Sequence, residues 1–168
     1  MTGPVVLAWL KGLAAALALV AALAIGAGRL GLLAGERPDN LGVHAGRLEP
    51  PSTTPNSVSS QAELYPEHPR HREAQIAPLA FEGDGAAAMT RLAALVEATD
   101  GAHVVERRAD YLYATYTTPW LHFVDDVEFW LDPTAGAIQV RSASRIGRSD
   151  LGANRDRIEA LRARFSAP

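Results

Sequence analysis

The sequence predicts an α+β domain: an antiparallel sheet of about five strands with two helices on one face, preceded by an N-terminal transmembrane helix. Three observations support this fold class. A long uncharged run stands near the N-terminus, several segments between residues 102 and 144 have the composition and alternation of strands, and apolar residues recur at helical spacing over 86–101 and 151–165.

The N-terminal run over residues 12–28 contains no charged residue. As a helix it would be about 26 Å long, close to the ~30 Å hydrocarbon core of a bilayer. Apolar residues extend the run over 5–33, and Lys11 and Arg29 stand where long cations can reach the interface. We therefore expect residues 5–33 to contact a lipid bilayer.

Composition divides the chain into three parts. Residues 1–33 form the anchor; a signal peptide with the cleavage pattern Ala22-Leu23-Ala24 and a buried soluble helix are the alternatives. Residues 34–74 are rich in Pro, Gly, Ser and Thr and predict an irregular tether. Residues 75–168 are expected to form the α+β domain.

The first half of that domain is predicted to contain a strand, a helix and two more strands. The segment 75–81 is a short strand, and Pro78 favours the edge of the sheet. Asp84 or Gly85 can cap the helix that follows, whose stripe contains Met89, Leu92, Leu95 and Val96. Segments 103–107 and 111–117 are rich in Val, Tyr and Thr, as strands are.

A hairpin is expected next, from strands at 123–131 and 137–144 with a turn between them. Matching the apolar faces fixes the register, because a shift of one residue would bury polar side chains. The predicted facing pairs are Leu131 with Ile138, Phe129 with Val140, and Glu128 with Arg141.

The last helix has one polar residue on its apolar stripe, Asn154. A buried amide without partners would cost about 1–3 kcal/mol, so Asn154 needs neighbours that hydrogen bond to it. Asp125 breaks the apolar pattern of its strand in the same way. We therefore expect a structural latch of Asp125, Asn154 and Asp150, with Arg145 or Arg155 balancing the Asp125 carboxylate.

Arginines are concentrated around the start of the last helix. Arg145, Arg148 and Arg155 surround a helix N-terminus, where free N–H groups favour anions, and they are a candidate anion site. Structural ion pairing is the favoured explanation of these arginines, because four carboxylates stand on the neighbouring strand. These are Asp125, Asp126, Glu128 and Asp132.

The sheet face opposite the helices is predicted to carry aromatic side chains beside an arginine. Such a composition is typical of a protein interface. An ordinary exposed face is the alternative. The candidate interface residues are Tyr111, Tyr113, Trp130 and Arg141.

Several classes of function have no support in the composition. A net charge of −3 gives no basic field for nucleic acid. The chain has no cysteine, so thiol catalysis and cysteine-ligated metal are excluded. Pro69 separates His68 from His71 and disfavours a helical metal site, His103 and His122 are isolated, and no cofactor-binding motif is present. We expect neither a cofactor nor a metal.

Four stretches resemble a bacterial and plastid family, the domain of unknown function numbered fourteen-ninety-nine. They are PNSVSSQ (55–61), FVDDVEFWLDP (123–133), VRSASRIG (140–147) and SDLGANRDRIEALR (149–162). The resemblance implies no reaction, but many relatives resemble exported lipoproteins or membrane proteins. Relatives often carry cysteines at the positions of Pro51 and Ser57.

Together these features predict a single-pass protein of the bacterial inner membrane with a periplasmic domain. The expected function is non-enzymatic binding of a partner or ligand in the envelope. The alternative is an enzyme or binder that acts on an anionic, phosphorylated envelope molecule through Arg145, Arg148 and Arg155.

Overall fold

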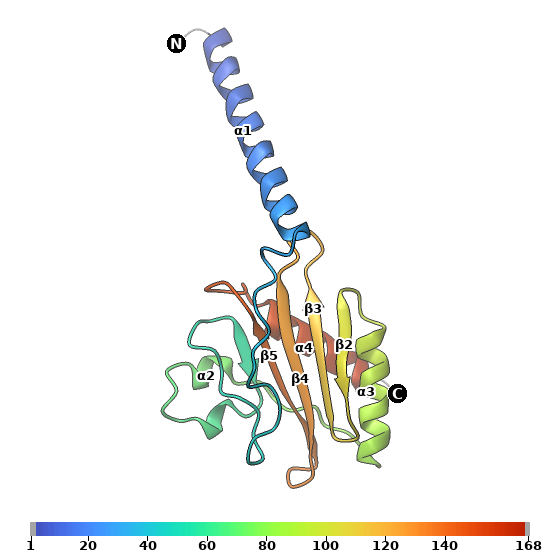
Figure 1. The fold of residues 1–168 in the computed structure, drawn as a ribbon. Coiled ribbons are helices and arrows are strands. Elements are labelled where there is room, and N and C mark those ends of the chain that lie inside the picture. The colour runs from blue at the N-terminus through green and yellow to red at the C-terminus, as the bar shows by residue number, and fades with distance from the viewer. Residues whose placement is uncertain (1–2, 167–168) are drawn as a thin grey trace.

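A computed structural model describes residues 3–166 as an N-terminal helix followed by an α+β domain (Figure 1). The predicted fold class is confirmed. Five antiparallel strands form one sheet in the order β1-β5-β4-β3-β2. The strands are β1 (Ser57–Ser59), β2 (Ala102–Arg107), β3 (Tyr111–Thr117), β4 (Val124–Asp132) and β5 (Ala137–Ser144). The helices are α1 (Gly3–Arg29), η1 (Ala62–Leu64), α2 (His71–Ala74), α3 (Gly85–Glu97) and α4 (Ala153–Phe165).

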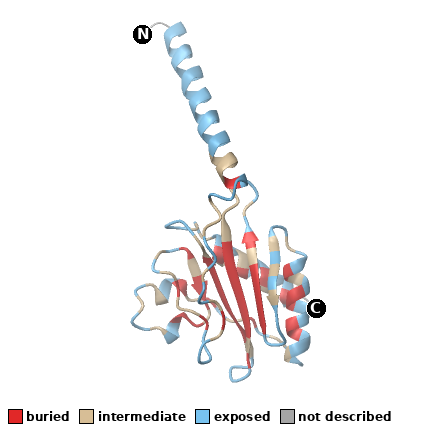
Figure 2. Ribbon diagram, in the orientation of Figure 1, coloured by how far each residue is buried: buried red, intermediate tan, exposed pale blue. Residues whose placement is uncertain are grey.

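The register of the β4–β5 hairpin is the one that apolar matching predicts. Leu131 pairs with Ile138, Phe129 with Val140, and Glu128 with Arg141. This register places Val127, Phe129, Ile138 and Val140 on the face that α3 and α4 cover, where they form the main apolar core. Figure 2 shows the resulting burial of the central strands.

Two predictions about the segment between α1 and α3 need correction. The predicted strand at 75–81 is reduced to two isolated bridges, Gln75 with Ser59 and Leu79 with Ile138. Proline at 78 has no N–H for a continuous ladder, which explains the interruption. The fifth strand is β1 instead, and it lies within the stretch expected to be a tether.

The stretch 34–74 packs on the domain rather than extending from it. Leu48 and Ala62 are fully buried, and Val58 and Ala74 nearly so. Backbone polar groups of this stretch are satisfied by distant side chains, as in the 2.8 Å bond from Leu48 N–H to Gln61 Oε1. The Pro and Ser residues of 34–74 thus belong to irregular backbone that burial and hydrogen bonds hold against the domain.

Helix α1 projects away from the domain, and Gly28 is its one buried residue (Figures 1 and 2). Its 27 residues make it the one helix within residues 3–166 that is long and apolar enough to cross a membrane. It ends against the loop between β3 and β4. A side chain at Gly28 would place its Cβ 2.3 Å from the Leu121 carbonyl oxygen, so this close contact requires glycine.

Candidate functional site

Asn154 is fully buried at the start of α4, and every polar group of its side chain has a partner. Its amide Nδ2 donates to Asn56 O at 3.0 Å, Ser144 Oγ at 3.0 Å and Asp150 Oδ2 at 2.9 Å. Its Oδ1 accepts from Ser142 Oγ at 2.5 Å. The residue therefore joins α4, the 145–150 loop, β5 and the segment before β1.

Asp125 reaches Asn154 through an arginine that the sequence analysis did not single out. Arg157 Nη2 lies 2.5 Å from Asp125 Oδ2, and Arg157 Nη1 donates to Asn154 Oδ1 at 2.7 Å. The same guanidinium lies 4.7 Å from the centroid of the Tyr116 ring. The prediction that Arg145 or Arg155 balances the Asp125 carboxylate was wrong. Arg157 is three residues after Asn154, so helical periodicity alone could have identified it.

Asp150 holds the first turn of α4. Its carboxylate accepts from Asn154 N–H at 2.9 Å and from Gly152 N–H at 3.1 Å. Partial burial by itself would raise the pKa of Asp150. The hydrogen bonds from Asn154 and Gly152 together outweigh burial, so the pKa lies below its ordinary value. The structure thus brings Asp125, Asn154 and Asp150 into one hydrogen-bonded cluster, which we call the latch.

The three arginines of the candidate anion site do not converge. Arg145 turns to the opposite face of the sheet, where its Nε and Nη2 lie 3.0 and 2.8 Å from the Asp126 carboxylate. Arg155 donates to the backbone carbonyls of Glu73 and Gln75 at 2.8 and 3.0 Å. Arg148 is exposed. Two of the three guanidiniums are thus already engaged within the domain, in different places.

Structural ion pairing accounts for three of the four carboxylates on β4. Asp125 pairs with Arg157, Asp126 with Arg145 and Glu128 with Arg141. Asp132 instead accepts from the N–H groups of Thr134 and Ala135 and from Gln139. It shapes the hairpin turn and neutralises no arginine.

The face expected to be an interface is covered by the chain itself. Residues 37–50, which we call the N-terminal strap, lie over it and pack Leu48 against three aromatic side chains. Arg37 lies 4.7 Å from the centroid of the Tyr113 ring. The four candidate interface residues are buried, so they cannot contact a partner while the strap is in place. They are Tyr111, Tyr113, Trp130 and Arg141.

Carboxylates under the strap are fully enclosed. Glu128 accepts from Gly42 N–H of the strap at 2.7 Å and from the Tyr111 hydroxyl at 2.8 Å. Burial raises the pKa of Glu128, although Arg141 and these hydrogen bonds oppose the shift. On Asp126, the Tyr113 hydroxyl donates at 2.6 Å, and burial with this bond raises the pKa of Tyr113 to about 12.

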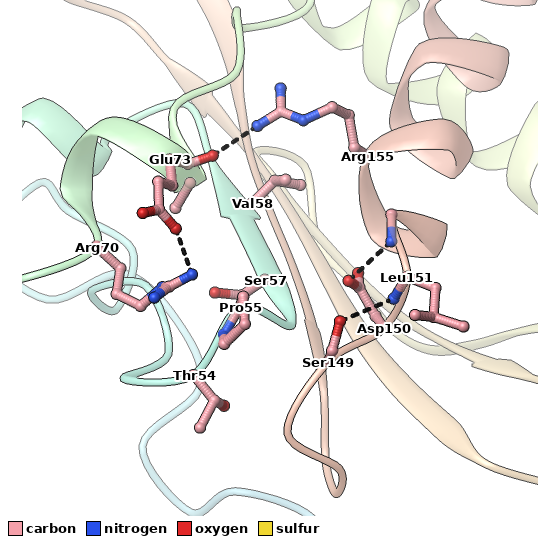
Figure 3. A pocket seen from close by; sticks show the side chains of 12 residues that line it. Thr54, Pro55, Ser57, Val58, Arg70, Glu73, Ser149, Asp150, Leu151 and Arg155 are labelled. Carbon is pink, nitrogen blue, oxygen red and sulfur yellow. Dashed lines mark hydrogen bonds and ion pairs between the residues drawn. The ribbon is translucent and has the colours of Figure 1, made fainter.

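A pocket of about 290 Å³ opens beside the latch, between β1 and α2 on one side and the start of α4 on the other (Figure 3). Its lining combines hydroxyl groups of Ser57 and Ser149 with the apolar surface of Val58 and Leu151. The two arginines at its rim are occupied: Arg70 pairs with Glu73, and Arg155 bonds to backbone carbonyls. The pocket therefore suits a small ligand of mixed polarity better than a multiply charged anion.

Comparison with known proteins gives one family. The family model described as "Protein of unknown function (DUF1499)" matches residues 47–165, which include every strand of the sheet and helices α3 and α4. No curated protein and no solved structure matches the chain. The family model begins within the N-terminal strap, in agreement with a fold that extends well upstream of residue 75.

Proposed function

Since the chain belongs to the DUF1499 family, which has no assigned activity, its function must be argued from its own residues, and we propose a membrane-anchored binding domain. In this proposal α1 spans the bacterial inner membrane once. The domain stands on the periplasmic side, is not an enzyme, and binds a partner or ligand of the envelope.

The observation that carries the proposal is the exposure of α1. Its apolar side chains do not pack on the domain: Leu13, Leu17 and Leu23 are each about 60% exposed, at 59%, 61% and 64%. In water such a helix would leave a very large apolar surface unburied, at roughly 25 cal/mol per Å². A bilayer removes that cost, and about 40 Å of helix is long enough to cross it.

The binding half of the proposal is supported by the pocket beside the latch. The latch fixes both walls, because Asn154 connects α4 to the segment before β1. A preformed concavity between rigid elements is the usual setting for a ligand. The anionic alternative receives less support, since Arg145 and Arg155 serve the fold itself.

Flotation of the full chain with liposomes tests the anchor. We expect the protein to rise with the vesicles and to stay with them in alkaline carbonate. Val20→Arg, in the middle of α1, should abolish flotation, because a central arginine costs at least about 2.5 kcal/mol on insertion. Val105→Arg, on exposed β2, is the matched control and should float normally. A wild-type chain that stays in the soluble fraction would reject the anchor.

The side of the membrane is tested with a single thiol. The chain contains no cysteine, so Glu36→Cys, at an exposed position just after α1, introduces a unique label site. A membrane-impermeant maleimide should label it in cells with a permeabilised outer membrane. Labelling only after lysis of the inner membrane would place the domain in the cytoplasm and contradict the periplasmic assignment.

A phosphate titration followed by NMR distinguishes a ligand of mixed polarity from a phosphorylated one. If the pocket takes a ligand of mixed polarity, phosphate should leave the amide resonances of residues 149–155 unshifted. Saturable shifts at these amides would support the anionic alternative instead.

A further inference from the structure

We propose that the end of the domain next to α1 is itself a lipid-contacting surface, with Trp120 held in the interfacial layer of the bilayer. This surface, the α1 edge, comprises residues 30–35, 118–122 and 145–148. The inference rests on the proposed membrane anchor and adds the orientation and depth of the domain.

The first step is the direct contact between α1 and the loop that carries Trp120. Gly28, one residue before the end of α1, abuts the backbone of Leu121 so closely that no side chain fits between them. The depth of the helix end therefore sets the depth of Trp120. Trp120 directly precedes Leu121, and consecutive Cα atoms are about 3.8 Å apart, so its backbone lies close to the end of α1.

The second step is that no flexible linker separates α1 from the sheet. Leu32 N–H donates to Ala27 O at 3.0 Å and folds the chain back on the last turn of the helix. A Cβ at Gly35 would lie 2.7 Å from atoms of Arg145 and Ile146. The chain leaving α1 is thus packed against the β5–α4 loop, which keeps the same edge turned toward the helix (Figure 1).

The third step is the apolar character of this edge. Trp120 is 69% exposed, and Leu30 and Leu32 are 78% and 71% exposed. Ile146 adds a further exposed apolar side chain on the adjacent loop. The contacts at Gly28 and Gly35 place the loops that carry Trp120 and Ile146 next to the end of α1, and these side chains stay exposed in the described part of the chain.

The chemistry of these side chains matches the membrane interface. Arg29, the last residue of α1, is exposed and marks the headgroup layer when the uncharged part of the helix is immersed. Tryptophan is enriched at that depth, because its ring is apolar while its indole N–H still hydrogen bonds. With Gly28 beside Leu121, Trp120 comes to the same layer as Arg29.

Fluorescence quenching by brominated lipids tests the inference in the full chain. Trp9→Phe removes the tryptophan of α1, which leaves Trp120 and Trp130 as emitters. Trp130 is buried toward the far end of β4 and serves as an internal reference. The sample is the Trp9→Phe protein floated with phosphatidylcholine liposomes whose acyl chains are brominated near the headgroup.

We expect quenching of the Trp9→Phe protein and its loss when Trp120→Phe is added. The control is Val105→Trp in that doubly substituted background, which places an exposed tryptophan on β2; its emission should not be quenched. A protein that floats but shows no quenching of Trp120 would overturn the lipid-contacting edge and leave the anchor intact. A protein that does not float would overturn the anchor and this inference with it.

Discussion

The two faces of the sheet are closed in different ways. One face is largely apolar apart from the latch and is covered by α3 and α4, with Leu112, Val127 and Phe129 fully buried. The other face carries Glu128 and Asp126, equally inaccessible, and is covered by the N-terminal strap. The helix-covered face is stabilised by burial of apolar area, which does not depend on the exact orientation of the groups. The strap-covered face depends on particular hydrogen bonds and ion pairs.

The two faces of the sheet therefore have different roles in the protein. The helix face would hold a sheet together in any α+β protein. The strap face joins the sheet to a segment that continues directly into α1. The charged pairs under the strap therefore connect the fold to the proposed membrane anchor.

The largest expected effect is on the apolar face. Phe129→Ala should lower the free energy of unfolding by about 3–5 kcal/mol, because the side chain is fully buried and its removal leaves a cavity. Urea unfolding of the detergent-solubilised protein measures it. A loss below about 1 kcal/mol would show that this face is loosely packed and does not depend on buried apolar area.

Removing a cation beneath the strap should cost nearly as much. Arg145→Ala leaves the buried Asp126 carboxylate without its bidentate partner, which should cost about 3 kcal/mol in the same assay. Arg148→Ala, three residues away and exposed, is the matched control and should change stability by less than about 0.5 kcal/mol. Equal effects for the two arginines would contradict the assignment of Arg145 to the fold.

The latch should show an intermediate effect and measurable coupling. Asn154→Ala should cost about 1–3 kcal/mol, because several buried groups lose their partner. A double-mutant cycle with Asp125→Ala should give a coupling energy above ~0.5 kcal/mol, transmitted by Arg157. Simple additivity of the two substitutions would show that Arg157 does not connect them.

The strap-covered face and the latch should also differ in their response to pH. Burial raises the pKa of Glu128 above its ordinary 4.5, so its contribution is complete below that pH and is lost as pH rises through the folded-state pKa. The pKa of Asp150 is lowered, so its contribution is present above its ordinary 3.8 and is lost as pH falls. Glu128→Gln should therefore flatten the stability profile above pH 4.5, and Asp150→Asn should flatten it at acid pH. If the urea midpoints of both variants varied over pH 3–8 in the same way as those of the wild-type chain, these pKa shifts would be contradicted.

The smallest effect is expected on the exposed side of α4. Glu159 pairs with Arg162 at 2.9 Å but is half exposed. Glu159→Ala should change stability by less than about 0.5 kcal/mol. A larger loss would mean that Glu159 makes a further stabilising contact within the fold. Buried and exposed ion pairs would then differ less in their contribution to stability.

The sequence was sufficient for the parts of the fold that follow a period. Alternation set the β4–β5 register, and the polar misfits Asn154 and Asp125 marked a site where buried groups meet. The strap was missed because it has no period: Gly42 and Leu48 are fixed by contacts with residues distant in the sequence, among them Glu128 and Gln61. Local composition describes such a segment as a tether, and only its tertiary partners show otherwise.

Hydrogen exchange at the Gly42 amide, in the full chain reconstituted in liposomes, tests whether the strap is fixed on the polar face of the sheet. That N–H donates to buried Glu128 at 2.7 Å and is one of the hydrogen bonds by which the strap closes the polar face. We expect its exchange to be slowed as strongly as that of the β4 amides, and Glu128→Ala to remove the protection at Gly42 while Phe129 stays protected. A Gly42 amide that exchanges as fast as an unstructured peptide would contradict a strap that joins the sheet to its anchor.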